Sequence, residues 1–285
     1  MRAAPSPSTE PVLSEGEGPR ARGTACPEGS RGMAIASGKR RLRRLCYSRR
    51  RRRLPGPARR VACMNPLWLV GLVAVLVVAL LVWEFYVCEG AHFGPRVVIG
   101  MYDLAATRYD RIKQFDPAWE TRFVGEPIAN AIEQLAGARV LDVGAGTGRV
   151  ARTLLPLVGP DLELVCLEPS RRMLALGREH APGGVWLRGR VDPLPFADAS
   201  FDIVVSLEVV EFTPHPRLSL QELVRVLRPG GSLLVTNRVG REAPLILGRT
   251  FRRVSFPERL NALGLQDVIL YPWQVEYDLA WAWKP

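Results

Sequence analysis

Apolar residues follow two different patterns along the chain. One is an unbroken run from Leu67 to Trp83, and the other begins after about residue 97, where short β-branched runs alternate with amphipathic stretches. The short runs predict strands at Arg139–Val143, Leu162–Leu167, Val185–Leu187, Ile203–Leu207 and Ser232–Thr236. The stretches between them predict helices at Gly148–Val158, Ser170–His180 and Leu218–Leu227. Strands that alternate with helices predict an α/β fold, in which helices cover both faces of a parallel sheet.

The end of the chain has a different pattern. A last helix is predicted at Pro257–Leu263, followed by strands at Asp267–Leu270 and Val275–Trp283. Only Tyr271-Pro272-Trp273 separates these strands. Because three residues are too few for a parallel crossover, the strands must pair antiparallel. The sequence therefore predicts a mostly parallel seven-stranded sheet that ends in an antiparallel hairpin.

The apolar run has the length and composition of a membrane span. A hydrocarbon core of about 30 Å takes about 20 helical residues, and residues 67–87 are just long enough. Trp68 at one end, with Trp83 and Tyr86 at the other, resemble interfacial anchors. A cleaved signal peptide is disfavoured because no small-x-small site follows the run, and a buried soluble helix because the run has no polar stripe. We expect a transmembrane helix at residues 66–87.

The net positive charge of the chain is concentrated at its N-terminal end. The 285 residues contain 39 Lys and Arg against 28 Asp and Glu, a net charge of +11 that would ordinarily indicate a nucleic-acid or acidic-membrane partner. However, residues 1–63 contain 16 of the basic residues and only 4 acids, so the remainder is close to neutral. This Arg-rich leader is also rich in Pro, Gly and Ser, and we expect it to be disordered. Two alternative interpretations are that the leader binds nucleic acid or anionic lipid, and that it is not translated.

Topology links the leader to the span. Seven arginines between residues 49 and 60 would hold that flank in the cytoplasm and export everything after the helix. If translation starts at Met64, the nearby positive side chains are Arg96, Arg108, Arg111 and Lys113, and the C-terminal domain stays in the cytoplasm. We expect an N-terminal arm or lid at residues 88–135 and a catalytic domain at residues 136–285.

The strongest chemical motif lies between the first predicted strand and the helix that follows it. Residues 142–148 read Asp-Val-Gly-Ala-Gly-Thr-Gly, and Glu168 stands twenty residues beyond Gly148, at the end of the next predicted strand. Glycines at such a turn let the backbone approach a ligand closely, while an acid at the second strand can accept both hydroxyls of a ribose. The dinucleotide-binding pattern is Gly-x-Gly-x-x-Gly, and its last glycine would fall at position 149, where this chain has arginine. The motif therefore favours a nucleoside ligand other than NAD.

These motifs and three others resemble a known family. The 142–148 segment, Leu167-Glu168-Pro169-Ser170, Leu194-Pro195-Phe196 and the 222–231 segment that ends in Arg-Pro-Gly-Gly are similar to successive motifs of class I S-adenosylmethionine-dependent methyltransferases. The resemblance is to the type 11 branch, whose substrates are quinones, lipids and other small molecules, and it covers about Tyr102 to Lys284. It implies a Rossmann-like sheet and S-adenosyl-L-methionine as the cofactor.

The resemblance also implies roles for individual residues. Gly144, Gly146 and Gly148 would line the methionine moiety, with Asp142 supporting the turn; Glu168 would bind the ribose hydroxyls, and Met173 would lie near adenine. The other implied cofactor contacts are Ala145, Pro169, Val191, Asp192, Ser206 and Leu207. The Tyr102-Asp103 and Tyr109-Asp110 pairs resemble those that fold a lid over the cofactor.

One position departs from the family pattern. The usual Gly-Asp-Ala, whose acid bonds the adenine amine, reads Gly189-Arg190-Val191-Asp192 in this chain. Either Asp192 replaces the missing acid or the Val191 amide alone holds adenine.

Candidate catalytic residues follow the fourth predicted strand. Methyl transfer is an in-line displacement, so a general base is needed only if the acceptor must lose a proton. Glu208, Glu211, His215 and Tyr109 are the candidates, with surface or packing roles as their alternatives. We expect no metal site and no disulfide, because the histidines are scattered and no Cys/His spacing resembles a metal site.

The sequence thus predicts a single-pass, membrane-anchored methyltransferase whose domain faces the cytoplasm and whose acceptor is small or lipophilic. The alternatives are a cofactor-binding scaffold without catalysis and a nucleic-acid methyltransferase that uses the leader. We expect the native chain to start at or near Met64. The sequence does not specify an oligomeric state.

Overall fold

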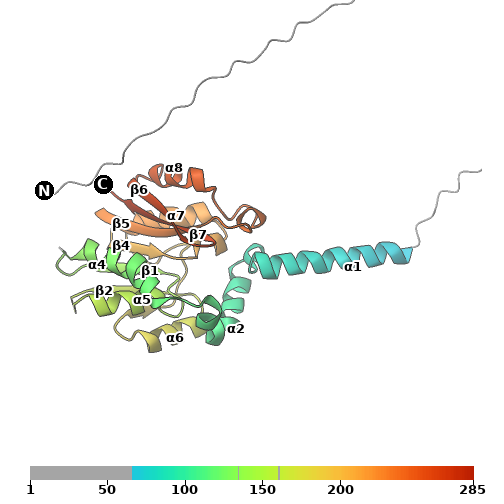
Figure 1. The fold of residues 1–285 in the computed structure, drawn as a ribbon, viewed down its shortest axis with the longest axis horizontal. Coiled ribbons are helices and arrows are strands. Elements are labelled where there is room, and N and C mark those ends of the chain that lie inside the picture. The colour runs from blue at the N-terminus through green and yellow to red at the C-terminus, as the bar shows by residue number, and fades with distance from the viewer. Residues whose placement is uncertain (1–65, 134, 160) are drawn as a thin grey trace, which may run out of the picture. The chain divides into compact units, whose positions relative to one another are not determined.

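A seven-stranded sheet forms the centre of the domain (Figure 1). The computed structural model describes residues 66–133, 135–159 and 161–285, and the predicted leader lies outside these residues. Five strands are parallel: β1 (Arg139–Val143), β2 (Glu163–Leu167), β3 (Val185–Leu187), β4 (Phe201–Ser206) and β5 (Leu227–Arg238). The last two, β6 (Gln266–Gln274) and β7 (Tyr277–Trp283), are antiparallel to their neighbours. This arrangement confirms the predicted Rossmann-like fold class.

The strand order is β3-β2-β1-β4-β5-β7-β6. The direction of winding therefore reverses between β1 and β4, which pair in parallel register with Leu141 opposite Val204. In open α/β sheets, ligands bind at the carboxyl ends of the strands beside such a reversal. The topology alone therefore indicates where to look for a site.

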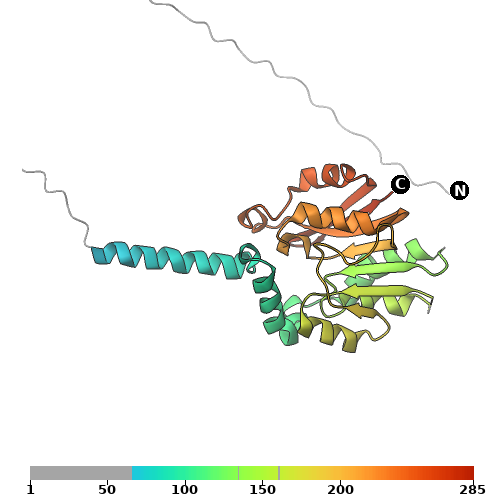
Figure 2. The same ribbon diagram turned by 180° about the vertical axis from the view of Figure 1, so that it is seen from behind.

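Helices cover both faces of the sheet, as Figures 1 and 2 show from opposite sides. Alternate residues of β1 point to opposite faces, because the side-chain period of a strand is two. Val140 packs with α4 (Glu126–Ile132) and α5 (Arg149–Leu154). Leu141 and Val143 belong to the core on the other face, which includes residues of α7 (Pro216–Val226) and α8 (Phe256–Asn261). Burial on both faces explains why the strands read as continuous apolar runs.

The structure moves several predicted boundaries. The predicted 148–158 helix ends at Leu154, where Pro156 lies in a short 3-10 turn, η4 (Leu155–Leu157). The hairpin turn was wrongly placed at residues 271–273, because β6 continues through them to Gln274. Pro272 is tolerated there because β6 is an edge strand, on which a missing backbone N–H costs no ladder bond.

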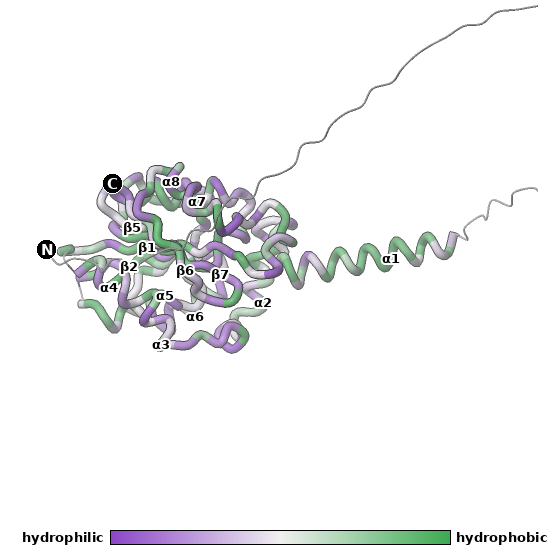
Figure 3. Tube along the Cα trace, turned by 45° about the horizontal axis from the view of Figure 1, so that its top comes forward, coloured by the Kyte–Doolittle hydropathy of each residue, from purple (hydrophilic) through white to green (hydrophobic). Residues whose placement is uncertain are grey.

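The segment before the domain contains an apolar helix that is exposed along its length. The helix α1 (Pro66–Val82) continues as the π-helical turn η1 (Trp83–Val87), and none of the residues of α1 is buried. Almost all of its residues are apolar, and the green colouring in Figure 3 follows them along α1. Within the described residues, this is the one helix that is long and apolar enough to cross a membrane.

A helical arm connects this segment to the sheet. It comprises η2 (Ala91–Phe93), α2 (Pro95–Lys113), α3 (Pro117–Glu120), η3 (Thr121–Gly125) and α4. Helix α2 ends at Gln114, whose left-handed backbone (φ 48°) closes the last turn by donating its N–H to the Asp110 carbonyl. The arm covers the carboxyl ends of the strands through contacts between α2 and α6 (Arg171–His180).

Candidate functional site

A cavity lies where the topology indicates a site, at the carboxyl ends of β1, β2 and β4 and beneath α2. Its empty volume is about 790 Å³, which includes its open mouth. Of the residues named from the sequence, it is lined by Tyr102, Tyr109, Gly144, Gly146, Glu168, Pro169, Met173, Arg190, Val191, Asp192, Leu207 and Glu208. Most of the cofactor contacts implied by the family resemblance therefore share one cavity.

The glycine turn forms one wall of the cavity. Gly144 has a φ of 76°, and a Cβ at this position would lie 2.3 Å from Cγ2 of Val209. A side chain is therefore excluded both by the backbone conformation and by the loop after β4. Gly146 has a φ of 55° and lines the cavity, and a Cβ there would meet only the Gly144 carbonyl, at 3.9 Å. The missing side chain at Gly146 leaves backbone accessible to a ligand.

Glu168 faces the same cavity from the end of β2. Its Oε1 accepts the Ser170 N–H at 2.8 Å, and its Oε2 accepts the Gly146 N–H at 2.9 Å. Burial raises the pKa of Glu168 to about 7, although these two amide hydrogen bonds act to lower it. The carboxylate is thus fixed against the glycine turn and retains lone pairs for further donors.

The segment that departs from the family pattern also borders the cavity, next to Glu168, whose carbonyl accepts the Gly189 N–H at 3.4 Å. Arg190, Val191 and Asp192 all line the cavity, and Met173 lies on the wall beside them. The guanidinium of Arg190 lies 3.1 Å from Oδ1 of Asp192. Both alternatives for adenine therefore remain available, since the Asp192 carboxylate and the Val191 backbone border the same space.

Some implied cofactor residues support the cavity without lining it. Asp142, Ala145, Gly148 and Ser206 are absent from its wall. Asp142 is buried beneath the turn, and burial together with the charge of Glu168 raises its pKa to about 8. Among the described residues, Oδ2 of Asp142 and Oγ of Ser206 are buried without a hydrogen-bond partner.

Helix α2 is fixed over the cavity by two aspartates. Asp103 accepts hydrogen bonds from Oγ of Ser170 at 2.5 Å and from the Arg172 N–H at 3.0 Å. Two turns later, Asp110 accepts Oγ1 of Thr147 at 2.5 Å and pairs with Arg152 at 2.9 Å. The aspartates thus hold α2 to the start of α6 and to the start of α5.

The tyrosines that precede these aspartates point into the cavity. Tyr102 and Tyr109 are seven residues apart, so they lie on one face of α2 with ring centroids 5.9 Å apart. Burial raises the pKa of both hydroxyls, and the charges of nearby glutamates add to the effect. Both hydroxyls therefore stay protonated at neutral pH, and α2 is placed as a lid.

Removing both anchors is expected to loosen this lid selectively. In Asp103→Ala/Asp110→Ala, we expect amide exchange in α2 to accelerate about tenfold or more, which corresponds to about 1.4 kcal/mol. Hydrogen exchange followed by mass spectrometry measures this change. Arg108→Ala, on the exposed side of the same helix, is the matched control and should leave the exchange unchanged. Equal exchange in the double variant and this control would contradict the anchoring role.

A buried ion-pair network lies beside the lid. Arg149, the first residue of α5, pairs with Glu120 at 2.6 Å and with Glu208 at 2.8 Å. Its guanidinium lies between the rings of Phe115 and Trp273, at 4.1 and 4.2 Å. Glu208 also pairs with Lys113 at the end of α2, at 2.5 Å. Arg149 therefore joins the lid, the glycine turn and the hairpin.

The ion-pair network makes Glu208 a poor candidate for a general base. Burial acts to raise its pKa, but the ammonium of Lys113 and the guanidinium of Arg149 outweigh that effect and lower it. A carboxylate with a lowered pKa accepts a proton poorly. Glu208 lines the cavity as a fixed negative charge that is already neutralised by two cations.

The remaining catalytic candidates lie outside the cavity wall. Glu211 is buried and accepts the Tyr277 hydroxyl at 2.6 Å, and burial raises its pKa to about 7. His215 is exposed and precedes the first turn of α7. The structure thus brings Tyr109 and Glu208 to the cavity, but neither Glu211 nor His215.

Sequence reasoning missed two parts of the site. One is the Arg149 network, because its partners Lys113, Glu120 and Glu208 are far apart in the sequence. The other is an apolar wall formed by Pro95, Val98, Ile99 and Phe212. The helical period of Val98, Tyr102 and Tyr109 was a usable signal for the second part, since these positions share one face of a helix.

Comparison with known proteins places the domain among methyltransferases. Residues 141–235 match a family described as a methyltransferase domain. A demethylmenaquinone methyltransferase of Renibacterium salmoninarum is 35% identical over 141 residues, which cover 50% of this chain and 58% of that protein. A phthiotriol/phenolphthiotriol dimycocerosates methyltransferase of Mycobacterium ulcerans is 41% identical over 110 residues, which cover 36% and 39%. The chain therefore spans little more than half the length of such relatives, or less.

Solved structures show the same fold. The CurJ carbon methyltransferase is similar with a TM-score of 0.51 and 20% identity, over 57% of this chain and 53% of that chain. The [4+2]-cyclase SpnF is similar with a TM-score of 0.53 and 21% identity, over 67% and 98%. The likeness extends to the whole sheet, and it includes a protein named for a reaction other than methyl transfer.

Proposed function

Because the chain carries a class I S-adenosylmethionine-dependent methyltransferase domain, we propose that the protein is a membrane-anchored enzyme that methylates a small lipophilic acceptor. One observation carries the proposal: a single cavity contains both the Glu168 carboxylate and an apolar wall formed by Pro95, Val98 and Ile99. The first feature suits a ribose, and the second suits an acceptor that prefers an apolar environment.

The residues present fit S-adenosylmethionine. Glu168 is held by two backbone amides and can accept ribose hydroxyls, while Gly146 offers backbone without a side chain. The resemblance assigns the methionine moiety to the wall made by Gly144 and Gly146, and adenine to the wall that contains Met173 and Val191. When bound, the cofactor supplies a methyl carbon already activated toward displacement by its sulfonium.

The protein then has two tasks, positioning and the exclusion of water. Tyr102 and Tyr109 close the cavity from α2. The Tyr102 hydroxyl donates to Oε2 of Glu89 at 3.1 Å, so the protonated hydroxyl of Tyr109 is the one that can donate a hydrogen bond to an oxygen of the acceptor. Glu208, neutralised by Lys113 and Arg149, is a poor proton acceptor. We infer that the acceptor reacts in a form that needs little help from a base, or that loses its proton to solvent before the lid closes.

A lipophilic acceptor is supported by the position of the apolar wall in the chain. Pro95, Val98 and Ile99 stand at the start of α2, a few residues after the candidate span ends at Val87. Relatives are named for demethylmenaquinone and for phthiotriol dimycocerosates, which are quinone and lipid acceptors. A chain that methylates such molecules gains from a site next to the bilayer.

Membrane anchoring and orientation are part of the same proposal. If translation starts at Met64, the positive side chains nearest the span at residues 66–87 are Arg96, Arg108, Arg111 and Lys113, which favour a cytoplasmic domain under the positive-inside rule. Two results would support this topology: the protein stays in the membrane pellet after alkaline carbonate extraction, and externally added protease leaves the domain intact in sealed cells. Release by carbonate would exclude the anchor.

Cofactor affinity is expected to depend on pH through Glu168. The ionised carboxylate is the form that accepts two ribose hydroxyls, and its pKa of about 7 leaves it mostly protonated at about pH 6. Binding should therefore release a proton and strengthen about tenfold as pH rises from about 6 to about 8. Calorimetry on wild type and Glu168→Gln measures this change. The variant keeps its size but lacks the titrating group, so equal pH slopes would contradict the assignment.

An acceptor panel tests the proposed substrate class. The full chain in detergent is given methyl-labelled S-adenosylmethionine with quinols, phenolic lipids and water-soluble phenols. We expect label in the first two classes, and a bulky substitution in the apolar wall, Val98→Trp, should reduce that label while cofactor binding is retained. Label only in water-soluble acceptors would exclude a lipophilic substrate.

A further inference from the structure

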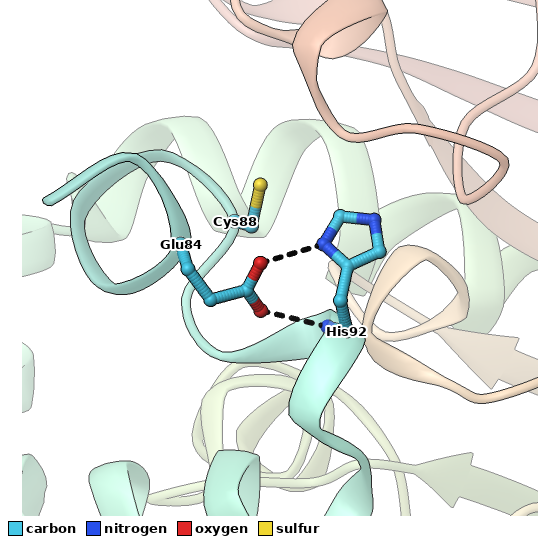
Figure 4. A group of neighbouring side chains, drawn as sticks. All are labelled: Glu84, Cys88 and His92. Atoms are coloured by element: carbon cyan, nitrogen blue, oxygen red, sulfur yellow. Dashed lines mark hydrogen bonds and ion pairs between the residues drawn. The ribbon is translucent and has the colours of Figure 1, made fainter. Parts of the chain in front are cut away.

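A cluster of three potential metal ligands lies at the end of the candidate span, outside the cavity already described. Glu84 belongs to η1, Cys88 follows it and His92 lies in η2, so the three are four residues apart in succession. One ligand atom from each side chain lies within 4.8 Å of the other two. Figure 4 shows Glu84 and His92 facing each other, with the Cys88 side chain next to them. Among the described residues, this is the one group of three or more His, Cys, Asp or Glu side chains whose possible ligand atoms lie this close together.

The cluster is more deeply buried than a surface ion pair. Glu84 is 2% exposed and Cys88 is fully buried, whereas His92 is partly buried. The ring of His92 stacks on Trp83 with centroids 5.4 Å apart. Burial of a carboxylate next to an apolar segment is costly unless a positive charge compensates it. The buried Glu84 carboxylate is therefore a group that a bound cation would stabilise.

His92 makes contacts through both of its ring nitrogens. Its Nδ1 lies 2.8 Å from Oε2 of Glu84, and its Nε2 lies 3.0 Å from the carbonyl oxygen of Leu247. Both ring nitrogens thus lie within hydrogen-bond distance of an oxygen atom. The Cys88 sulfur lies within 4.8 Å of one ring nitrogen of His92 and of one carboxylate oxygen of Glu84.

The outer contacts match those of a metal-binding histidine. Such a histidine usually donates its second ring N–H to a backbone carbonyl or a carboxylate, which fixes the ring and leaves the other nitrogen for the metal. His92 has this arrangement through Leu247. Glu84 is also fixed, since its Oε1 accepts the backbone N–H of His92 at 2.8 Å. Cys88 Sγ lies 3.8 Å from the carbonyl of Leu245, so this loop contacts two of the ligands.

We propose that Glu84, Cys88 and His92 bind a zinc-type divalent cation at the end of the span. Carboxylate, thiolate and imidazole are all ligands that Zn²⁺ accepts, and a water would complete a tetrahedral site. Bond lengths of about 2.0–2.3 Å place tetrahedral ligand atoms about 3.3–3.6 Å apart, so shifts of an ångström or so close the site. Binding requires that the Cys88 thiol gives up its proton and that Nδ1 of His92 carries none, so the displaced protons pass to solvent. The loaded cluster is then neutral, with two negative ligands around a 2+ ion.

The metal would join two segments that are far apart in the sequence. Its ligands contact the carbonyls of Leu245 and Leu247, in the loop between β5 and α8 that includes η6 (Ala243–Leu245). A bound ion would fix the end of the span to this loop. The role is structural, and it is independent of the methyl-transfer cavity.

Metal binding is tested on the full chain in detergent, with Cys26, Cys46 and Cys63 replaced by serine so that Cys88 and Cys166 are the remaining thiols. After chelator treatment and dialysis, Zn²⁺ is titrated against a competing chromophoric chelator. We expect one equivalent to bind and binding to weaken at least 100-fold in Cys88→Ala and in His92→Gln. Co²⁺ in place of Zn²⁺ should give a thiolate-to-metal charge-transfer absorption that Cys88→Ser abolishes.

Matched controls separate this site from adventitious binding. His180→Gln, an exposed histidine elsewhere, should retain full affinity. S-adenosylmethionine binding should be unchanged in Cys88→Ala, which confirms that the variant is folded and keeps the test independent of the proposed enzyme activity. Failure to bind one equivalent, or binding that persists in Cys88→Ala, would overturn the proposal and leave the cluster as a hydrogen-bonded cap.

Discussion

Replacing Glu168 with alanine is expected to weaken S-adenosylmethionine binding about 100-fold, which corresponds to about 2.7 kcal/mol. The carboxylate is the one charged acceptor in the cavity that backbone amides hold in place, through Gly146 and Ser170. Two charge-assisted hydrogen bonds to ribose hydroxyls are worth about this much. Isothermal titration calorimetry on the full chain measures the loss.

Two controls make the Glu168 result interpretable. Glu168→Gln keeps the size and one acceptor oxygen, so its loss should lie between those of wild type and alanine. Asp198→Ala removes an exposed acid whose partner Arg225 also bonds Glu222, and it should leave binding unchanged. An affinity within threefold of wild type for Glu168→Ala would remove the ribose assignment.

Replacing Arg149 with methionine is expected to cost about 3–5 kcal/mol of unfolding free energy. The change leaves Glu120 without its guanidinium partner, while Glu208 keeps only Lys113. These carboxylates are only 4% and 6% exposed, so water cannot replace the lost partner. For a domain of this size we expect the melting temperature to fall by about 10 °C or more, as measured by differential scanning fluorimetry.

A surface ion pair and a rescue variant complete this test. Arg139→Ala breaks the half-exposed pair with Glu163 and should cost about 1 kcal/mol or less. Adding Glu120→Gln to Arg149→Met removes a stranded charge and should recover part of the loss. If Arg149→Met melts within 2 °C of wild type, the network does not stabilise the domain.

Local patterns allowed much of the sheet to be predicted. The boundaries of β1 and β3 agree with the sequence because β-branched runs end at glycine turns or charged residues. The hairpin turn was misplaced because Pro272 reads as a breaker, whereas an edge strand tolerates it. Helix α2 was not predicted as a helix, because its apolar and aromatic residues do not form one stripe. Tyr102 and Tyr109 face the cavity, whereas Leu104 is exposed.

The site was predictable where one segment carries the chemistry. The glycine turn, Glu168 and Val191 follow motif order, and each lines the cavity. Pairings between distant segments were not predictable, because no local spacing links Arg149 to Glu208 or Asp110 to Thr147. The Glu84, Cys88 and His92 cluster was not predicted for another reason. A Cys/His spacing does not include a carboxylate, and here one of the three residues, spaced four apart, is a glutamate.

The fold alone does not determine which reaction a protein catalyses. SpnF, named as a [4+2]-cyclase, shares the sheet at a TM-score of 0.53. Glu168 and the glycine turn concern binding only, whereas the apolar wall and the tyrosines of α2 concern the acceptor. A test of the central claim must therefore follow the methyl group itself.

The most direct measurement is transfer of labelled methyl from S-adenosylmethionine into a total lipid extract by the full chain in detergent. We predict label in the organic-extractable fraction, release of S-adenosylhomocysteine in equal amount, and loss of both in Glu168→Ala. Cofactor binding without label in any extractable fraction, across lipid and quinone extracts, would contradict methyl transfer to a lipophilic acceptor.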